Sequence, residues 1–171
     1  MNVRETPFVG FDHIDARVDD LAAARAMYDV LMPALGLVDI IPADHGVEYY
    51  EPPQIGRARR FFGIHLDAKH QANNTRVCFA AGSPAEVDRL AEIARGAGAR
   101  EIDGPEIPYS DEKYYAVFFN DPSGNPLEIA FRRQHDTALS SVEGSEVIDA
   151  TAAFAAREAQ AEASAGGGHI A

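Results

Sequence analysis

Apolar and polar residues alternate with a period of two over residues 11–18, FDHIDARV. Ile14, Ala16 and Val18 fall on one side of this segment, and a polar set that begins with His13 falls on the other. Successive side chains of a β-strand point to opposite faces of the sheet. The alternation therefore predicts a strand with one packed face and one wet face.

The period lengthens to that of a helix directly after this strand. Asp19 or Asp20 supplies the cap, and the segment DLAAARAMYDVLM carries an apolar stripe that begins at Leu21. Pro33 and Gly36 predict the end of this helix. Three short strands are expected next, over residues 37–41, 47–51 and 60–67.

The same order of elements restarts at residue 76. The segment RVCFAA predicts a strand, and Ser83-Pro84-Ala85-Glu86 is a capping box with proline at the first helical position. The following helix is expected to end at Gly96. Three further strands are expected over residues 99–103, 114–119 and 126–131, with a turn at 121–125 between the last two.

These two runs of one strand, one helix and three strands form an internal repeat. A shift of 63 residues places HIDARVDDL on RVCFAAGSP, and the match lies in element order and hydrophobic parity. A unit of about 60 residues exceeds the usual solenoid repeat. We therefore expect two modules, 8–68 and 74–133, within one domain at 8–133. Residues 134–171 are expected to form a linker, a short helix and a disordered end.

Composition excludes several classes of partner. The chain has 171 residues and a formal net charge of -12, and an acidic surface repels nucleic acid and anionic lipid, so neither is an expected partner. No apolar stretch approaches the roughly 20 residues that span a bilayer. The N-terminus lacks the apolar run of a signal peptide, so we expect a cytoplasmic protein. Cys78 is the single cysteine, which excludes an internal disulfide and a thiolate zinc cluster.

Three segments resemble the vicinal-oxygen-chelate superfamily, which includes glyoxalases, bleomycin resistance proteins and ring-cleaving dioxygenases. FDHIDARVDDLAAARAMYDVLMPALGL resembles the family's histidine-bearing first strand and helix. YYAVFFNDPSGNPLEIAF resembles its closing hairpin, and VCFAAGSPAEVDRLAEIARGAGA resembles the middle strand and helix. The resemblance implies an α+β fold in which two tandem βαβββ modules form a cupped mixed sheet with helices outside, to which we add a C-terminal tail helix. It also implies a small-molecule substrate and a homodimer.

The family draws one metal ligand from the first and the last strand of each module. In this chain those positions match His13 and His65 in the first module, and Arg76 and Glu128 in the second. The first interpretation is an enzyme in which His13, His65 and Glu128 hold a divalent metal such as Fe, Mn, Ni, Zn or Co. The metal would polarise or chelate substrate oxygens in lyase, isomerase or dioxygenase chemistry, with Glu128 as the catalytic base.

Arg76 stands where the family usually has a histidine ligand. A guanidinium group does not ligate a metal or lose its proton. Two unit charges about 4 Å apart interact by roughly 4 kcal/mol at an effective dielectric near 20, which disfavours a cation beside Arg76. The second interpretation is a metal-free small-molecule-binding protein that resembles the bleomycin resistance members, with Arg76 paired to Glu128. The third is an interaction protein whose contact element is the tail, and the sequence leaves all three open.

Further side chains on the expected cup faces are candidates for substrate binding. They are polar or aromatic residues at strand positions: Asp15, Arg17, Tyr50, Arg76, Cys78 and Tyr115. Arg76 suits a carboxylate or phosphate, which an arginine binds through two parallel hydrogen bonds. Asp15 and Arg17 have a salt bridge as their alternative role. Cys78 has an inert packed thiol as its alternative, and the tyrosines have core packing as theirs.

Overall fold

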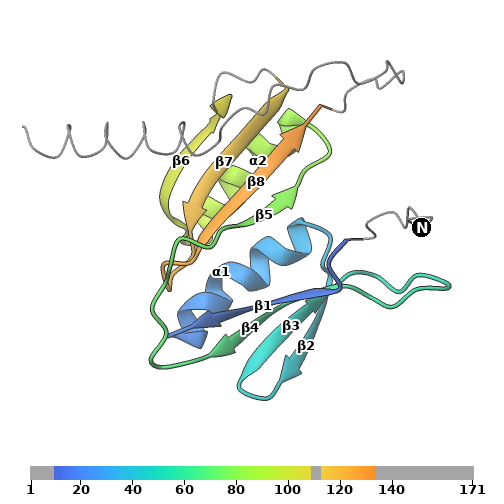
Figure 1. Cartoon of the computed structure of the whole chain (residues 1–171), viewed down its shortest axis with the longest axis vertical. Coiled ribbons are helices and arrows are strands. Elements are labelled where there is room, and N and C mark those ends of the chain that lie inside the picture. The colour runs from blue at the N-terminus through green and yellow to red at the C-terminus, as the bar shows by residue number, and fades with distance from the viewer. Residues whose placement is uncertain (1–9, 109–112, 134–171) are drawn as a thin grey trace, which may run out of the picture. The chain divides into compact units, whose positions relative to one another are not determined.

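The computed structural model describes residues 10–108 and 113–133. Its elements follow the predicted order of two βαβββ modules (Figure 1). The first module contains β1 (His13–Val18), α1 (Leu21–Ala34), β2 (Asp39–Ala43), β3 (Gly46–Tyr50) and β4 (Phe61–Leu66). The second contains β5 (Val77–Ala80), α2 (Pro84–Gly96), β6 (Arg100–Glu106), β7 (Tyr114–Asn120) and β8 (Pro126–Arg132). The predicted tail helix lies outside the described residues.

Each module forms its own four-stranded mixed sheet. The strand order is β1-β4-β3-β2 in the first sheet and β5-β8-β7-β6 in the second, so the two modules have the same topology. The first strand of each module runs parallel to the fourth, and the remaining neighbours are antiparallel. This arrangement confirms the predicted fold class and places the first and last strands of each module side by side.

Side-chain caps fix the starts of both helices. The Asp20 carboxylate accepts a hydrogen bond from the Ala23 amide at 3.0 Å, and the Ser83 hydroxyl accepts one from the Glu86 amide at 3.2 Å. Such caps satisfy backbone donors that have no partner within the helix. Pro33 does not end α1 but lies within its last turn, where it removes one backbone hydrogen bond because proline has no N–H group.

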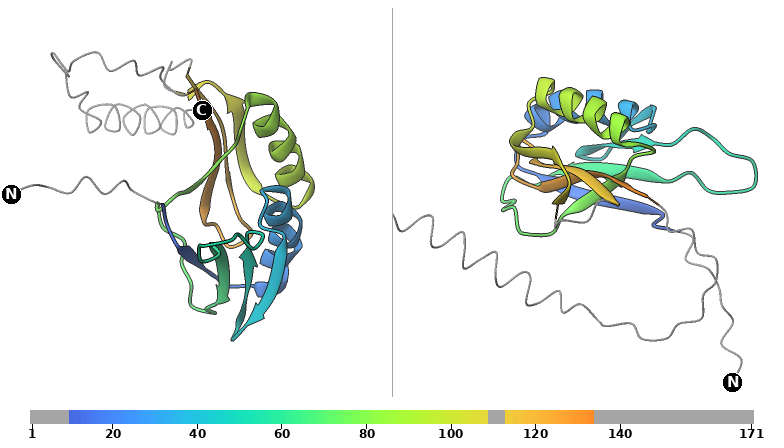
Figure 2. Two further views of the ribbon diagram at one scale, coloured as in Figure 1. Left: turned by 90° about the vertical axis from the view of Figure 1, so that its right-hand side faces the viewer. Right: turned by 90° about the horizontal axis from the view of Figure 1, so that it is seen from above.

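Both α1 and α2 lie on one side of the two sheets, and no other helix of residues 10–108 and 113–133 covers the opposite side (Figure 2). We call the uncovered sides the open faces of the first and second modules. The helix side holds the main core, whose largest fully buried side chains are Tyr28, Tyr49, Met27, Leu31, Met32, Ile64, Leu90, Leu127, Ile129, Val18, Val87 and Val117. Period-two alternation therefore sorts β1, β4 and β8 as predicted, apart from Leu66, which is 44% exposed at the end of β4. The edge strand β2 differs, since its neighbouring residues Ile40 and Ile41 are both 40% exposed.

A polar network centred on Asp121 joins the second module to the first. Asp121 is fully buried and accepts a hydrogen bond from the Tyr28 hydroxyl of α1 at 2.8 Å. Asn125 donates from its side-chain nitrogen to Asp121 at 2.8 Å and to the Arg17 carbonyl oxygen at 2.8 Å. The turn predicted at 121–125 therefore also connects the end of β1 to the start of β8.

Neither of the two helices in the described part of the chain is long and apolar enough to cross a membrane.

Candidate functional site

The open face of the second module holds a buried carboxylate, that of Glu128 in β8. Glu128 is 6% exposed, and its Oε1 accepts a hydrogen bond from the Tyr114 hydroxyl. The Arg76 Nη1 atom lies 3.9 Å from the other oxygen, Oε2. A buried carboxylate needs such partners because its desolvation is otherwise expensive. The structure thus brings together Arg76 and Glu128, as the second interpretation of the sequence expected.

The guanidinium groups of two arginines on this face lie over aromatic rings. The Arg76 guanidinium carbon lies 4.8 Å from the centre of the Phe118 ring, and the Arg132 guanidinium carbon lies 3.8 Å from the centre of the Tyr114 ring. Cation–π contacts of this kind hold a guanidinium group in place and leave its N–H edge available to a partner. The side chain of Arg76 is 44% exposed.

Cys78 lies opposite Glu128 in the β5–β8 register. The residue is exposed at the sheet edge, but partial burial of its thiol and a hydrogen bond to Glu128 raise its pKa to about 12, while Arg132 and Arg76 oppose the shift. Burial and the hydrogen bond to Glu128 also raise the pKa of the Tyr114 phenol. Both groups are therefore neutral proton donors toward Glu128 at neutral pH, and Cys78 is not an activated nucleophile.

The open face of the first module is organised in rows across its strands. One row aligns His13, Phe61 and Tyr50, the next aligns Asp15, Gly63 and Glu48, and the third aligns Arg17, His65 and Gly46. Side chains in one row are direct cross-strand neighbours. The first row is aromatic, and the next two rows carry the ionisable groups.

Stacked planar groups form the aromatic row. The His13 and Phe61 rings lie 4.7 Å apart with an interplanar angle of 4°, and Phe61 contacts Tyr50 with ring centres 4.7 Å apart. The Arg59 guanidinium carbon lies 4.8 Å from the centre of the Tyr50 ring. A hydrogen bond to Asp12 at 2.9 Å raises the pKa of His13, and the charges of Asp15 and Glu48 act in the same direction.

Asp15 and His65 are hydrogen-bonded across the other two rows, with Asp15 Oδ1 3.3 Å from His65 Nε2. A Cβ atom at Gly63 would lie 2.4 Å from Asp15 Oδ1 and 3.0 Å from His65 Nε2. A side chain at this position would therefore displace at least the end of Asp15 from its observed place. Asp15 is thus bonded to His65, which lies two residues beyond Gly63 along β4. Arg17 is exposed and lies directly opposite His65 in the β1–β4 register.

The register changes the family correspondence given to His65. The repeat matches Asp15 with Cys78, and the residues opposite these two in the fourth strands are Gly63 and Glu128. Gly63 therefore occupies the position equivalent to Glu128, and His65 lies two residues beyond it. The sequence could not reveal this because a shift of two residues preserves the side-chain face.

The chemistry of these positions does not fit the metal that the resemblance implies. Arg76 is no ligand, Gly63 has no side chain, and both oxygens of Glu128 face a donor or a cation. Within residues 10–108 and 113–133, no three His, Cys, Asp or Glu side chains gather closely enough to hold a metal ion. The ligand set His13, His65 and Glu128 stays a prediction that this arrangement does not support.

The predicted set of substrate-binding residues is wrong at one tyrosine of β7. Tyr115 points to the helix side of β7, where its hydroxyl donates to Asp88 of α2 at 2.8 Å, so it does not belong to the open face. Tyr114 takes that place beside Glu128. The alternation of Tyr114, Ala116 and Phe118 opposite the core residues Val117 and Phe119 was the available signal. Tyr50 does lie on the open face of the first module, where its hydroxyl donates to Glu48 at 2.7 Å.

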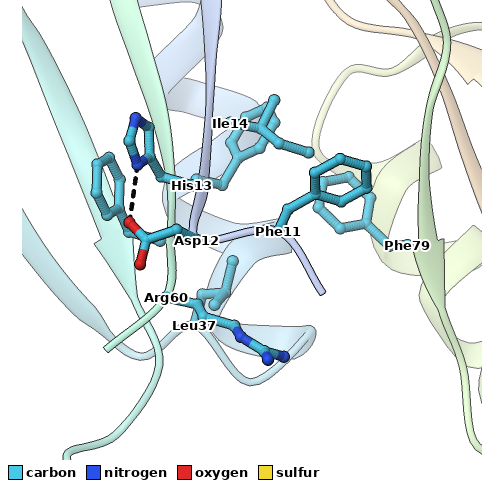
Figure 3. A pocket seen from close by; sticks show the side chains of 9 residues that line it. Phe11, Asp12, His13, Ile14, Leu37, Arg60 and Phe79 are labelled. Atoms are coloured by element: carbon cyan, nitrogen blue, oxygen red, sulfur yellow. Dashed lines mark hydrogen bonds and ion pairs between the residues drawn. The ribbon is translucent and has the colours of Figure 1, made fainter. Parts of the chain in front are cut away.

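A small pocket lies at the start of β1 (Figure 3). Phe11 and Phe79 point toward one another across it, and Arg60 lies to one side. Its volume of about 140 Å³ is below the 300 Å³ or so of ordinary ligand sites. A wider hollow of about 500 Å³ adjoins it over Gly10, Asp12 and Arg57. His13 is among the residues that line the smaller pocket, but neither cavity is lined by Arg76, His65 or Glu128, so the open faces remain the candidate sites.

The chain belongs to the Glyoxalase/Bleomycin resistance protein/Dioxygenase superfamily, which its sequence matches over residues 10–129. Its fold is similar to that of a glyoxalase/bleomycin resistance protein from Albidiferax ferrireducens, with 26% identity, a TM-score of 0.58, and coverage of 72% of this chain and 98% of the other. No curated protein matches the sequence.

Two fosfomycin resistance proteins share the fold at lower identity. FosX from Mesorhizobium loti is 16% identical with a TM-score of 0.53, over 74% of this chain and 95% of the other. FosX from Listeria monocytogenes is 20% identical with a TM-score of 0.51, over 72% of this chain and 90% of the other, and that structure contains Mn(II) and a dihydroxypropylphosphonic acid. The solved structures that share this fold thus include fosfomycin resistance proteins, and one of these structures contains a divalent metal.

Proposed function

We propose that this chain is a metal-free small-molecule-binding protein that holds an anionic ligand on the open face of its second module. The single observation that carries the proposal is the position of Arg76, 3.9 Å from Glu128 and 44% exposed. In this proposal the positive charge of Arg76 neutralises Glu128 in place of the metal that the first interpretation of the sequence expected. The exposed N–H groups of Arg76 suit a carboxylate, phosphate or phosphonate.

Charge supports this face over that of the first module. Three charged groups lie close enough to Cys78 to shift its pKa, namely Glu128, Arg132 and Arg76. Two of them are cations and one is a buried anion, so the local charge is positive. On the first module, the carboxylates of Asp12, Asp15 and Glu48 surround His13. Of the two open faces, that of the second module near Arg76 therefore offers an anionic ligand the more favourable potential.

A ligand and metal titration tests the proposal. Propylphosphonate and benzoate serve as anionic probes, and the melting temperature is measured against the concentration of each probe. A ligand that binds only the folded state stabilises it by about 2.7 kcal/mol at 100 times its dissociation constant. We expect at least one probe to raise the melting temperature and Arg76→Ala to abolish the rise. The control is Arg57→Ala, which removes an arginine paired with Glu51 at 2.6 Å and remote in sequence from this face.

Metal addition separates this proposal from the metal enzyme. Fe(II), Mn(II), Ni(II), Zn(II) and Co(II) should each leave the melting temperature unchanged. A rise that disappears in Glu128→Gln would instead support the metal-dependent interpretation. The predicted homodimer is tested in the same preparations by sedimentation.

A further inference from the structure

Arg132, at the end of β8, is a second arginine on the open face of the second module. It lies four residues beyond Glu128, so period-two alternation gives both side chains the same face of the sheet. Arg132 is exposed, and within residues 10–108 and 113–133 no ion pair or hydrogen bond engages its guanidinium group. A guanidinium group is always charged and carries five N–H donors. These donors are therefore available to an anionic ligand.

The strand β7 supports both arginines of this face. The guanidinium carbon of Arg76 lies 4.8 Å from the centre of the Phe118 ring, and that of Arg132 lies 3.8 Å from the centre of the Tyr114 ring. Tyr114 and Phe118 share a face of β7 and are four residues apart, which is roughly 13 Å at the usual rise of a strand. Stacking on a ring restricts a guanidinium group before any ligand arrives. The face thus presents two cations at separate, fixed points.

The buried carboxylate of Glu128 lies between these two cations. Its Oε2 is 3.9 Å from Arg76 Nη1, and its Oε1 accepts the hydrogen bond of the Tyr114 hydroxyl. The ring of the same tyrosine carries Arg132, so a continuous chain of contacts joins the two arginines through Glu128. Both arginines also lie close enough to Cys78 for their charges to act on its thiol. The order of charges on this face is therefore cation, anion, cation.

This order of charges favours one arrangement of charge in a ligand. A single anionic group placed midway between the arginines would be repelled by Glu128. A ligand with an acidic group at each end and a neutral middle would place both acidic groups at arginines and neither at Glu128. Each arginine can bind a carboxylate through two parallel hydrogen bonds. Two carboxylates joined by a short neutral chain therefore match this face.

From this arrangement we infer that the ligand of this face is a linear dicarboxylate and that Arg132 binds its second carboxylate. The inference rests on the proposed function, which places the first anionic group at Arg76. Arg132 is then the residue that determines specificity, because it distinguishes a ligand with two acidic groups from a ligand with one. Tyr114 is a positioning residue, since it holds Arg132 on its ring and does not itself contact the ligand.

Matched pairs of carboxylic acids test the inference. The dicarboxylates are succinate, glutarate, adipate and pimelate, and each is compared with the monocarboxylate of the same chain length, namely butyrate, valerate, hexanoate and heptanoate. Calorimetric titration of the full chain gives each dissociation constant at neutral pH. The ionic strength is held constant because salt screens exposed charges. We expect at least one dicarboxylate to bind about tenfold more tightly than its partner, since it makes a second charge-assisted contact.

Arg132→Gln removes the second cation and keeps a polar side chain. In this variant the ratio of affinities within the pair should fall to about two, the statistical advantage of a ligand with two equivalent ends. The matched control is Arg133→Gln, which causes the same change in net charge at an exposed neighbouring residue. Alternation along the chain directs the Arg133 side chain away from that of Arg132. The control should therefore keep the ratio of the unmodified protein, and melting curves establish that each variant is folded.

Two results would overturn the inference. One is a ratio near two in every pair for the unmodified protein, and the other is an unchanged ratio in folded Arg132→Gln. Arg76→Gln tests the proposed function separately, because it should weaken the binding of both members of each pair. Binding of benzoate or propylphosphonate without binding of any dicarboxylate would overturn the inference alone. If none of these anions binds, both proposals are wrong.

Discussion

Asp15 lies directly opposite Gly63 in the β1–β4 register, at the position where the second module pairs Cys78 with Glu128. The two modules therefore carry their acidic group on different strands. In the second module the carboxylate belongs to the last strand and is paired with Arg76. In the first it belongs to the first strand and is paired with His65. This exchange gives one fold two faces with different chemistry.

Arg76→His tests whether the guanidinium group is what excludes a metal. The substitution removes a positive charge and adds an imidazole beside Glu128 and Cys78, which supply carboxylate and thiol ligands. We expect Zn(II) or Ni(II) to raise the melting temperature of this variant by several degrees. Arg76→Ala serves as the control, because it removes the charge without adding a ligand. An equal response of both variants, or of the unmodified protein, would contradict the expectation.

The reactivity of Cys78 reports its contact with Glu128. Its pKa of about 12 leaves a thiolate fraction of about 1 in 10,000 at pH 8, against about a quarter for a free thiol with a pKa near 8.5. Reaction with a disulfide reagent should therefore be slow at pH 8 and accelerate as the pH rises toward 12. Glu128→Gln removes the neighbouring charge, lowers the thiol pKa and should increase the rate at pH 8. An unchanged rate would mean that burial alone controls the thiol.

Tyr28→Phe should destabilise the junction between the modules. The lost hydroxyl donates to the fully buried Asp121 at 2.8 Å, and a hydrogen bond to a charged group contributes about 1.5–3 kcal/mol. Urea denaturation measures this loss in the free energy of unfolding. Tyr115→Phe is the matched control because its hydroxyl bonds to Asp88 at an exposed site, and its cost should stay below about 0.5 kcal/mol.

Ser83→Ala should cost about 1 kcal/mol in the free energy of unfolding, because it removes the side-chain acceptor of the α2 cap. Ser83→Asp keeps an acceptor at this position and should recover most of the loss. Urea denaturation again measures the change. Similar destabilisation by both substitutions would show that the hydroxyl acts through packing and not through its hydrogen bond.

Most of the fold follows from local patterns in the sequence. Alternation with a period of two places Ile64 and Ile129 in the core, and the caps at Asp20 and Ser83 mark both helix starts. These features depend on neighbours within a few residues, which the sequence displays directly. The repeated order of strands and helices likewise predicts two modules of equal topology.

Only the tertiary structure decided how the candidate site is divided. Parity predicts the face of a strand residue but not its row, since a shift of two residues keeps the face. Register therefore placed Gly63, and not His65, opposite Asp15. The choice of Tyr114 over Tyr115 also required knowing which side of β7 meets α2. The sequence determines which residues can form a site on each sheet, and long-range pairing between strands determines which of them meet.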